Sequence, residues 1–300
     1  MMPQMPALLE SMLKKEYGEE TLLKIREGFS EKRSVTLRVN PLKASMADVT
    51  GALDAAGIAY EHAPIYDQAL IIPQNTEEDI RALPIYESGG VYLQSLSSMV
   101  PPLLMHLKSG ASVLDMAAAP GGKTTLMCAL AENHLTVTAC EKNKIRADRL
   151  RYNLNMQGAR GVTVMETDAR ELSDFFRFDT ILLDSPCTGS GTIALLEGEK
   201  ERRMEAGWIQ KTVQTQKKLM KKAVTLLSKG GEMVYSTCSI LKEENEQVVQ
   251  TALDAGMKLV PIDEAWVEAL PQLKSEIKGT VTICPTKLYE GFFVARMKKV

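Results

Sequence analysis

Short runs rich in β-branched and aliphatic residues alternate with helical patterns through the second half of the chain. The strand-like runs are SVLD (112–115), TVTAC (136–140), VTVME (162–166), DTILLD (179–184) and GEMVYST (231–237). Helical spacing of apolar positions predicts helices at about 122–132, 143–156 and 209–229. Strands without clean polar alternation, interleaved with helices, are typical of a parallel sheet covered on both faces. The pattern predicts a doubly wound, Rossmann-like α/β sheet.

The two ends of the chain carry shorter elements. Before the large sheet, we expect two amphipathic helices within 5–28, a strand at 34–40, a helix at 45–56, and short strands at 58–62 and 68–72. At the other end, TVTIC (280–284) and GFFVARM (291–297) lie too close together for a helical crossover. They predict an antiparallel pair of strands at the edge of the large sheet.

A domain boundary is expected between the first short elements and the large sheet. The stretch from Pro73 to Gly90 is acidic and rich in residues that break helices and strands. We therefore predict a small α/β N-terminal domain at residues 1–85 and a larger α/β domain at residues 86–300.

Composition and charge narrow the range of possible functions and locations. The 300 residues carry a net charge of −2, so no overall positive field marks a binder of nucleic acid. Five cysteines, an odd number without CxxC spacing, argue against a disulfide framework or a zinc site and indicate a reducing compartment. The N-terminus lacks the apolar core of a signal peptide, and no segment approaches the roughly 20 apolar residues of a membrane-spanning helix. We expect a cytoplasmic monomer without a metal ion or a membrane partner.

Unusual residues follow the carboxyl ends of the predicted strands, where open α/β sheets bind their ligands. The first group is DMAAAPGGKTT (115–125), between a strand and a helix. It is not a P-loop, because Ala117 stands where that motif requires glycine, and no GxGxxG dinucleotide motif occurs. Its small residues still let the backbone approach a ligand, with N–H groups at the helix start. A carboxylate or phosphate fits such a turn, for example the methionine carboxylate of S-adenosylmethionine; the alternative is an ordinary strand-to-helix turn.

Two acidic residues follow the next two strands. Glu141 is placed to accept hydrogen bonds from a ribose diol, and Asp168 to contact an adenine. Acidic residues at strand ends are common, so each of these signals is weak when taken alone.

Two cysteines stand in loops rather than inside helix or strand patterns. They are Cys187 in DSPCTGSG and Cys238 in STCS. Most cysteines of a reduced protein are small core hydrophobes, and we assign that role to Cys128, Cys140 and Cys284. Cys187 and Cys238 each follow a buried strand, so both thiols are expected to face one crevice.

Two thiols and a carboxyl group beside a methyl donor suit methylation of carbon 5 of cytosine. That carbon is a poor nucleophile until a thiolate adds to carbon 6 of the ring. Asp184, at the end of its strand, can protonate or hydrogen-bond ring N3. The second cysteine is a candidate for assisting removal of the carbon-5 proton and release of the first. The spacing of the two cysteines does not decide which one attacks.

The motifs DMAAAPGGKT, DSPCTGSG and YSTCSILKEENEQVV, with RVNPLK upstream and GFFVA near the end, closely resemble the Sun/Fmu family of RNA cytosine-C5 methyltransferases. The resemblance spans about residues 35–297. It implies formation of 5-methylcytosine in tRNA or rRNA, with S-adenosylmethionine as methyl donor and S-adenosylhomocysteine as product. It also implies Cys238 as nucleophile and Cys187 as the release residue. DNA cytosine methyltransferases attack with the cysteine of a PC motif, so Cys187 stays the alternative nucleophile.

The resemblance also implies a set of contacts with the cofactor or the base. They are Ala117, Ala118, Ala119, Pro120, Gly121, Gly122, Lys123, Glu141, Asp168 and Asp184. Arg146 is a further candidate for cofactor binding. The chain departs from the family pattern at Lys242, which replaces the usual proline of the S-x-x-P-E-E-N segment, and at Ser95 and Glu290. None of these changes removes a proposed chemical group, but they leave the RNA target open.

Contacts with RNA are expected from local patches. The two basic clusters are Lys142, Lys144, Arg146, Arg149 and Arg151, and Lys211, Lys218, Lys221 and Lys222. Each cluster also fits an ordinary solvated helix face. Residues 1–85, with Arg38 in RVNPLK, are expected to add an RNA-binding surface. The rival hypotheses are a methyltransferase for DNA or a protein amide, and an RNA-binding relative without catalysis.

Overall fold

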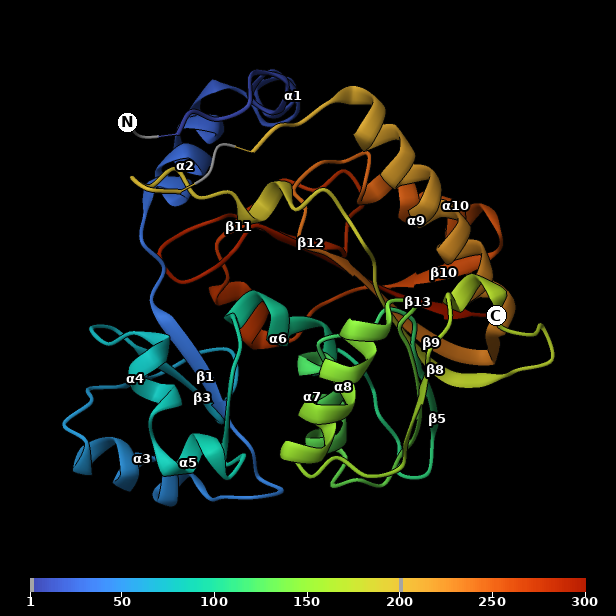
Figure 1. Cartoon of the computed structure of the whole chain (residues 1–300). Coiled ribbons are helices and arrows are strands. Elements are labelled where there is room, and N and C mark those ends of the chain that lie inside the picture. The colour runs from blue at the N-terminus through green and yellow to red at the C-terminus, as the bar shows by residue number, and fades with distance from the viewer. Residues whose placement is uncertain (1–2, 200–201) are drawn as a thin grey trace. The chain divides into compact units, whose positions relative to one another are not determined.

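The computed structural model describes residues 3–199 and 202–300 (Figure 1). The chain forms two compact units. The central unit is Ser34–Leu182, and the terminal unit combines Met1–Arg33 with Leu183–Val300. The chain passes from one unit to the other within strand β8 (Phe178–Asp184). The boundary predicted at 85/86 divides the chain differently and stays a prediction; residues 1–2 of the predicted first domain lie outside the described residues.

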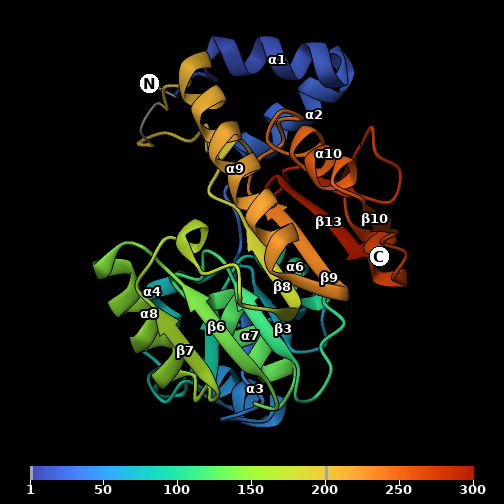
Figure 2. The ribbon, with the colours of Figure 1, turned by 90° about the vertical axis from the view of Figure 1, so that its right-hand side faces the viewer.

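The central unit contains the parallel strands. They lie in the order β8, β5 (Ser112–Asp115), β6 (Thr136–Cys140) and β7 (Val162–Met165), and each neighbouring pair is parallel. Helix α7 (Gly122–Leu130) connects β5 to β6, and helix α8 (Lys144–Met156) connects β6 to β7 (Figure 2). Val113 and Leu114 in β5 are fully buried, as expected for a strand covered on both faces. The predicted α/β pattern of this region is confirmed.

A second, antiparallel sheet belongs to the central unit. Its order is β2 (Glu61–His62), β3 (Ala69–Ile72), β1 (Val35–Val39) and β4 (Val91–Leu93). Helix α3 (Met46–Ala55) begins with a capping box formed by Ser45 and Asp48. The elements predicted between residues 34 and 72 are confirmed. The breaker-rich stretch after them is not a bare linker, because it contains α4 (Glu77–Arg81) and α5 (Pro84–Glu87) and leads into β4.

The terminal unit contains antiparallel strands. β13 (Phe292–Lys299) lies between β12 (Val281–Ile283) and β9 (Leu227–Thr237), and β10 (Met257–Val260) also pairs with β13. β11 (Gln272–Leu273) pairs with β12. The predicted antiparallel pairing of the two C-terminal runs is confirmed. β12 and β9 pair with β13 on either side, so β13 lies inside this antiparallel group of strands.

Two helices accompany these strands. They are α9 (Ala206–Leu226) and α10 (Glu246–Asp254) (Figure 1). α9 ends at Leu226, before the predicted end at 229, and Leu227 begins β9. Leu227 is fully buried, and its carbonyl accepts a hydrogen bond from Lys299 Nζ at 2.8 Å. Lys299 Nζ also donates to the Val224 carbonyl at 2.7 Å, so the last strand binds the end of α9 and the start of β9.

The predicted N-terminal helix pair is confirmed and packs within the terminal unit. Helices α1 (Ala7–Tyr17) and α2 (Glu19–Ser30) are separated by Gly18, whose φ is 82°. Leu13 and Phe29 are fully buried and share an apolar cluster with Ile240 and Leu241. The helices therefore support the loop between β9 and α10.

The remaining elements are short. They are α6 (Leu96–Leu103) and η1 (Ala169–Glu171) in the central unit, and η2 (Ser190–Thr192) and η3 (Ala265–Ala269) in the terminal unit. Within residues 3–199 and 202–300, no helix combines the length and the apolar character needed to cross a bilayer.

Candidate active site

Cys187 and Cys238 lie side by side in the terminal unit. Cys187 follows β8 and Cys238 follows β9, and their sulfur atoms are 3.1 Å apart. Both residues are half-buried. Cys128 and Cys140 are fully buried within α7 and β6, and Cys284 is half-buried after β12. The two loop thiols thus lie together as expected, while their chemical roles stay predictions.

Hydrogen bonds join the two loops that carry these cysteines. The Gly191 N–H donates to the Cys238 carbonyl at 3.1 Å. The hydroxyls of Ser190 and Ser239 are 2.8 Å apart, and Ser190 Oγ also accepts the Ile240 N–H at 3.0 Å. The small polar residues of DSPCTGSG and TCS therefore fix each loop on the other.

The loops leave no room for a side chain at Gly191. A Cβ atom there would lie 2.0 Å from the Gly291 carbonyl oxygen. The Gly291 N–H in turn donates to the Gly191 carbonyl at 2.8 Å. The glycines of DSPCTGSG and GFFVA meet at one close approach of the backbone, which accounts for glycine in both motifs.

Asp184 lies in the same unit as Cys187 and Cys238. Asp184 Oδ1 accepts a hydrogen bond from Ser236 Oγ at 2.7 Å. The hydrogen bond to Cys238 and then burial raise the pKa of the Cys187 thiol well above its ordinary value, and the charge of Glu244 acts in the same direction. Cys187 is therefore held as a thiol in this arrangement.

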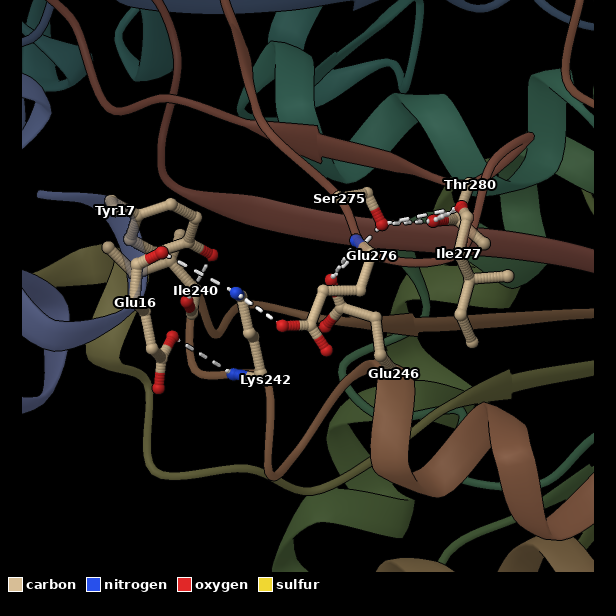
Figure 3. A network of polar contacts seen from close by, with 9 residues as sticks. All are labelled: Glu16, Tyr17, Ile240, Lys242, Glu246, Ser275, Glu276, Ile277 and Thr280. Atoms are coloured by element: carbon tan, nitrogen blue, oxygen red, sulfur yellow. Dashed lines mark hydrogen bonds and ion pairs between the residues drawn. The ribbon is translucent and has the colours of Figure 1, made fainter.

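Figure 3 shows polar contacts between α1 and the loop before α10. Tyr17 Oη donates to the Ile240 carbonyl at 2.8 Å, and the Lys242 N–H donates to the Glu16 carboxylate at 3.4 Å. Lys242 Nζ contacts Glu276 at 2.8 Å and lies 5.6 Å from the centre of the Tyr17 ring. Lys242, which replaces the proline of the family pattern, thus anchors the loop to two neighbouring segments.

Acidic side chains gather at these contacts. Burial, followed by the neighbouring charge of Glu243, raises the pKa of Glu16 to about 8. Burial also raises the pKa of Glu246, although its carboxylate accepts a hydrogen bond from Ser275 Oγ at 3.1 Å. Ser275 Oγ lies 2.6 Å from Thr280 Oγ1 (Figure 3). Two buried acidic groups with raised pKa values thus lie among the contacts that support the Cys238 loop.

In the central unit, the predicted glycine-rich turn joins β5 to α7. Gly121 directly precedes α7 with a φ of 109°, in the left-handed region that favours glycine. The Asp115 carboxylate accepts hydrogen bonds from Thr124 Oγ1 at 2.7 Å and from the Ala117 N–H at 3.4 Å. Within the turn, Ala118, Ala119 and Gly121 are buried, Ala117, Gly122 and Lys123 are half-buried, and Pro120 is exposed. The turn is a fixed stretch of backbone that fits a small anionic group.

Arg38 supports this turn from β1. It is fully buried, and its guanidinium donates to Thr125 Oγ1 at 2.6 Å and to the Gly122 carbonyl at 3.3 Å. It also donates to Gln94 Oε1 at 2.9 Å and lies over the Tyr92 ring. Burial lowers its pKa to about 10. The expectation that Arg38 contacts RNA is wrong, because its side chain does not reach the surface.

Glu141 lies at the end of β6, as predicted. Its carboxylate accepts the Asn143 N–H at 2.8 Å and pairs with Arg146 at 3.3 Å. Arg146 also donates to the Ala119 carbonyl at 2.8 Å, so it links Glu141 to the glycine-rich turn.

Asp168 follows β7 and is bound by Arg170. Both carboxylate oxygens accept hydrogen bonds from the guanidinium, and these bonds lower the pKa of Asp168 to about 2. A glycine-containing turn at a helix start and carboxylates at the ends of the next two strands suit a nucleoside that carries a carboxylate. The residues of the central unit therefore fit S-adenosylmethionine.

Three buried polar residues near the cysteines are not predicted from the sequence. Gln216, Glu244 and Asn245 are all fully buried. The signal for Gln216 is its place on the apolar face of α9, where Leu219 and Ala223 are also buried. Glu244 and Asn245 stand out only as part of the EEN segment.

Comparisons with known proteins cover most of the chain. A family model described as 16S rRNA methyltransferase RsmB/F matches residues 102–298, and one for the ferredoxin-like domain of RsmF/B-like methyltransferases matches residues 5–77. The ribosomal RNA small subunit methyltransferase F of Vibrio parahaemolyticus is 34% identical over 282 residues, which cover 88% of this chain and 56% of that protein. The tRNA (cytosine(72)-C(5))-methyltransferase of Pyrococcus horikoshii is 34% identical over 231 residues, covering 76% and 57%. The chain spans about half the length of these curated relatives.

Two solved structures are similar over almost the whole chain. A methyltransferase homologue from Pyrococcus horikoshii has a TM-score of 0.82 and 30% identity, covering 99% of this chain and 100% of that one. NSun6 from the same organism, solved with SFG, has a TM-score of 0.86 and 25% identity, covering 98% of each chain. The fold is that of the Rossmann-like methyltransferases. The chain belongs to the RsmB/F methyltransferase family, and its resemblance to the Sun/Fmu proteins is confirmed.

Proposed function

We propose that this chain transfers a methyl group from S-adenosylmethionine to carbon 5 of a cytosine in RNA. The observation that carries the proposal is the 3.1 Å separation of the Cys187 and Cys238 sulfur atoms on adjoining loops. A structural role for either cysteine needs no such pairing, whereas chemistry at carbon 5 uses one group that attacks and one that assists release. Family membership and the strand-end residues of the central unit support the proposal.

Cys238 is the proposed nucleophile. Its thiolate sulfur bonds to carbon 6, and the electrons of the ring double bond shift towards carbon 5 while Asp184 gives a proton to ring N3. When bound, S-adenosylmethionine supplies a methyl group on a positively charged sulfur. Carbon 5, activated by the bond between Cys238 and carbon 6, would accept that methyl group, and S-adenosylhomocysteine would be the product.

Cys187 is the proposed release residue. As a thiolate or through a water molecule, it takes the proton from carbon 5. The freed electron pair restores the ring double bond, Cys238 leaves as a thiolate, and the N3 proton returns to Asp184. The hydrogen bond to Cys238, the first cause of the raised Cys187 pKa, is lost once Cys238 is bonded to the base. Cys187 then ionises more readily, at the step that needs a base.

The cofactor contacts of the proposal lie in the central unit. The backbone of Ala117–Lys123 would hold the methionine carboxylate, Glu141 the ribose diol and Asp168 the adenine. Arg146 would steady Glu141 and the turn, through the contacts that it makes with both.

The proposed partner is tRNA or rRNA, bound through local basic patches. On α8, Lys144 and Arg149 are exposed and form no ion pair within the described part of the chain. On α9, Lys211, Lys218 and Lys221 are exposed and Lys222 is half-buried. Phosphate contacts of this kind would make binding weaker as salt rises. An RNA-binding role for residues 1–85, a monomeric state and a cytoplasmic location belong to the same proposal.

Methyl transfer to purified nucleic acids tests the function. With a tritiated methyl donor, we expect label in tRNA or rRNA and none in DNA. Cys238→Ala is expected to abolish transfer, Cys187→Ala to accumulate a covalent protein–RNA adduct, and Cys284→Ala, the control, to change neither. An adduct with Cys238→Ala but not with Cys187→Ala would reverse the two roles. Absence of transfer to any RNA would contradict the proposal.

A further inference from the structure

Glu244, in the loop before α10, holds the segment that contains Cys187. Its carboxylate accepts hydrogen bonds from the Thr188 N–H at 2.8 Å and from Thr188 Oγ1 at 2.6 Å. Gln216 Nε2 donates to the Pro186 carbonyl at 3.0 Å and reaches the Glu244 carboxylate at 3.4 Å. The Glu244 carboxylate therefore holds the residue after Cys187, and the Gln216 amide holds the residue before it.

Asn245, the next residue, holds the segment of the other cysteine. Thr237 Oγ1 donates to Asn245 Oδ1 at 2.5 Å, and Asn245 Nδ2 donates to the Ser239 carbonyl at 2.9 Å. Thr237 and Ser239 flank the second cysteine. Tyr235 Oη donates to the Glu244 carbonyl at 2.5 Å and so fixes the dipeptide itself. Two adjacent residues thus hold one cysteine segment each.

The pKa of Glu244 is raised by burial, and hydrogen bonds to its carboxylate partly offset this effect. Thr188, Gln216 and Ser239 all donate hydrogen bonds to the carboxylate. Donors that converge on a buried carboxylate stabilise the ionised state. Its negative charge acts on Cys187 and opposes ionisation of that thiol.

We propose that Glu244 and Asn245 are positioning residues of the thiol pair, and that Glu244 also decides which sulfur becomes the thiolate. Asn245 orients Cys238. Glu244 orients Cys187 and, through its charge, keeps the shared proton on that sulfur, so that the thiolate forms on Cys238. The two cysteines then differ in role because the Glu244 carboxylate holds the segment of Cys187, whereas the Asn245 amide holds that of Cys238. The inference rests on the proposed function, since it concerns the same two sulfur atoms.

Alkylation of Cys187 tests the effect of the charge without RNA or methyl transfer. In a Cys238→Ala background, the charge of Glu244 still acts on Cys187, and the buried Tyr235 also interacts with that thiol. The rate of modification by iodoacetamide, followed by mass spectrometry as a function of pH, reports the thiolate fraction. Adding Glu244→Gln is expected to raise the rate at pH 7.5 about tenfold and to lower the pH midpoint by about one unit, because an amide keeps the shape and removes the charge. An unchanged midpoint overturns the proposal.

Two further variants separate charge from position. Glu243→Gln is the matched control, because it makes the same change one residue away, where the charge acts on Glu16. It is expected to leave the midpoint unchanged, and a shift equal to that of Glu244→Gln overturns the proposal. Glu244→Asp keeps the charge and shortens the side chain, so the midpoint is expected to stay high. If Glu244→Gln does not fold, Glu244→Asp carries the test, and a lowered midpoint overturns the proposal.

Methyl transfer by the full chain tests the positioning role. Asn245→Ala and Glu244→Gln are each expected to lower kcat at least tenfold while KM for RNA stays within about twofold, because the thiols are displaced and the RNA contacts are not. An effect on KM alone overturns the positioning role. If the unaltered chain methylates no RNA, the proposed function fails, and the alkylation midpoints still decide the effect of Glu244 on Cys187.

Discussion

Glu141 is the single residue through which cofactor binding is best tested. Its side chain is 4% exposed and pairs with Arg146 at the end of β6. A carboxylate has several lone pairs, and a ribose diol would donate to those directed at the cofactor. A hydrogen bond to a charged acceptor contributes about 1.5–3 kcal/mol, so Glu141→Gln is expected to weaken S-adenosylmethionine binding about tenfold or more. Isothermal titration calorimetry measures the change.

Glu166 provides the control for this prediction. It is an exposed acid that follows the next strand, β7, and its carboxylate pairs with Arg151 at 3.5 Å. Glu166→Gln therefore removes the same charge from a neighbouring strand end and is expected to leave the affinity unchanged. Equal affinities for the two variants would exclude the ribose contact of Glu141.

Single residues are predictable from sequence where their chemistry is unusual for their surroundings. Cys187 and Cys238 stand out because small polar residues and breakers surround them in apparent loops. Arg38 and Gln216 do not, because their roles depend on partners that are distant in sequence. Arg38, for example, is satisfied by Gln94 and by the start of α7. An arginine in a strand pattern is ordinarily exposed, and nothing local indicates that these acceptors surround it.

At the scale of elements, the packing of α1 on the loop before α10 is expected to weaken as pH rises. The pKa of Glu16 is about 8 in the folded protein, against an ordinary value of 4.5. Between these values the folded state binds more protons than the unfolded state, so stability falls with rising pH. Glu16→Gln removes this dependence and is expected to be about 1–2 kcal/mol more stable than the parent at pH 8. Urea unfolding at pH 5 and pH 8 measures the difference.

Glu20 is the matched control for Glu16. It lies on α2, is largely exposed and pairs with Lys24 at 3.0 Å. Glu20→Gln is expected to follow the pH dependence of the parent, since an exposed ion pair contributes little. If Glu16→Gln also followed it, the carboxyl group of Glu16 would not be the source of the pH effect.

Elements are predictable where the local pattern agrees with the tertiary contacts. The parallel strands and α7 and α8 follow from runs of β-branched residues and helical spacing. The junction of α9 and β9 does not. LLSKGG has the form of a helix end, whereas the strand begins at Leu227, where Lys299 from the last strand binds the backbone carbonyls of Val224 and Leu227. The stretch 73–90 is rich in residues that break helices and strands. Two helices nevertheless begin there, because a capping box at Thr76 starts α4 and a proline is the first residue of α5.

At the scale of the whole molecule, the division into units is not visible in the sequence. Composition shifts mark boundaries between consecutive segments, whereas the terminal unit joins Met1–Arg33 to Leu183–Val300. Its apolar cluster draws Leu13 and Phe29 from the N-terminal helices and Ile240 and Leu241 from the loop after β9. Such a cluster follows from packing between distant segments, which no local pattern encodes.

The shared cluster predicts that the N-terminal helices stabilise the part of the chain that carries the cysteines. The two tryptophans, Trp208 and Trp266, both lie in the terminal unit, so their fluorescence reports its unfolding. Leu13 is fully buried, and Leu13→Ala is expected to cost about 2–5 kcal/mol in urea unfolding followed by this signal. Leu23→Ala, on the neighbouring helix and 56% exposed, is expected to stay within about 0.5 kcal/mol of the parent. The alternative is that residues 1–33 act only as a detachable RNA-binding segment. Both variants would then unfold like the parent, because the stability of the part that carries the tryptophans would not depend on Leu13.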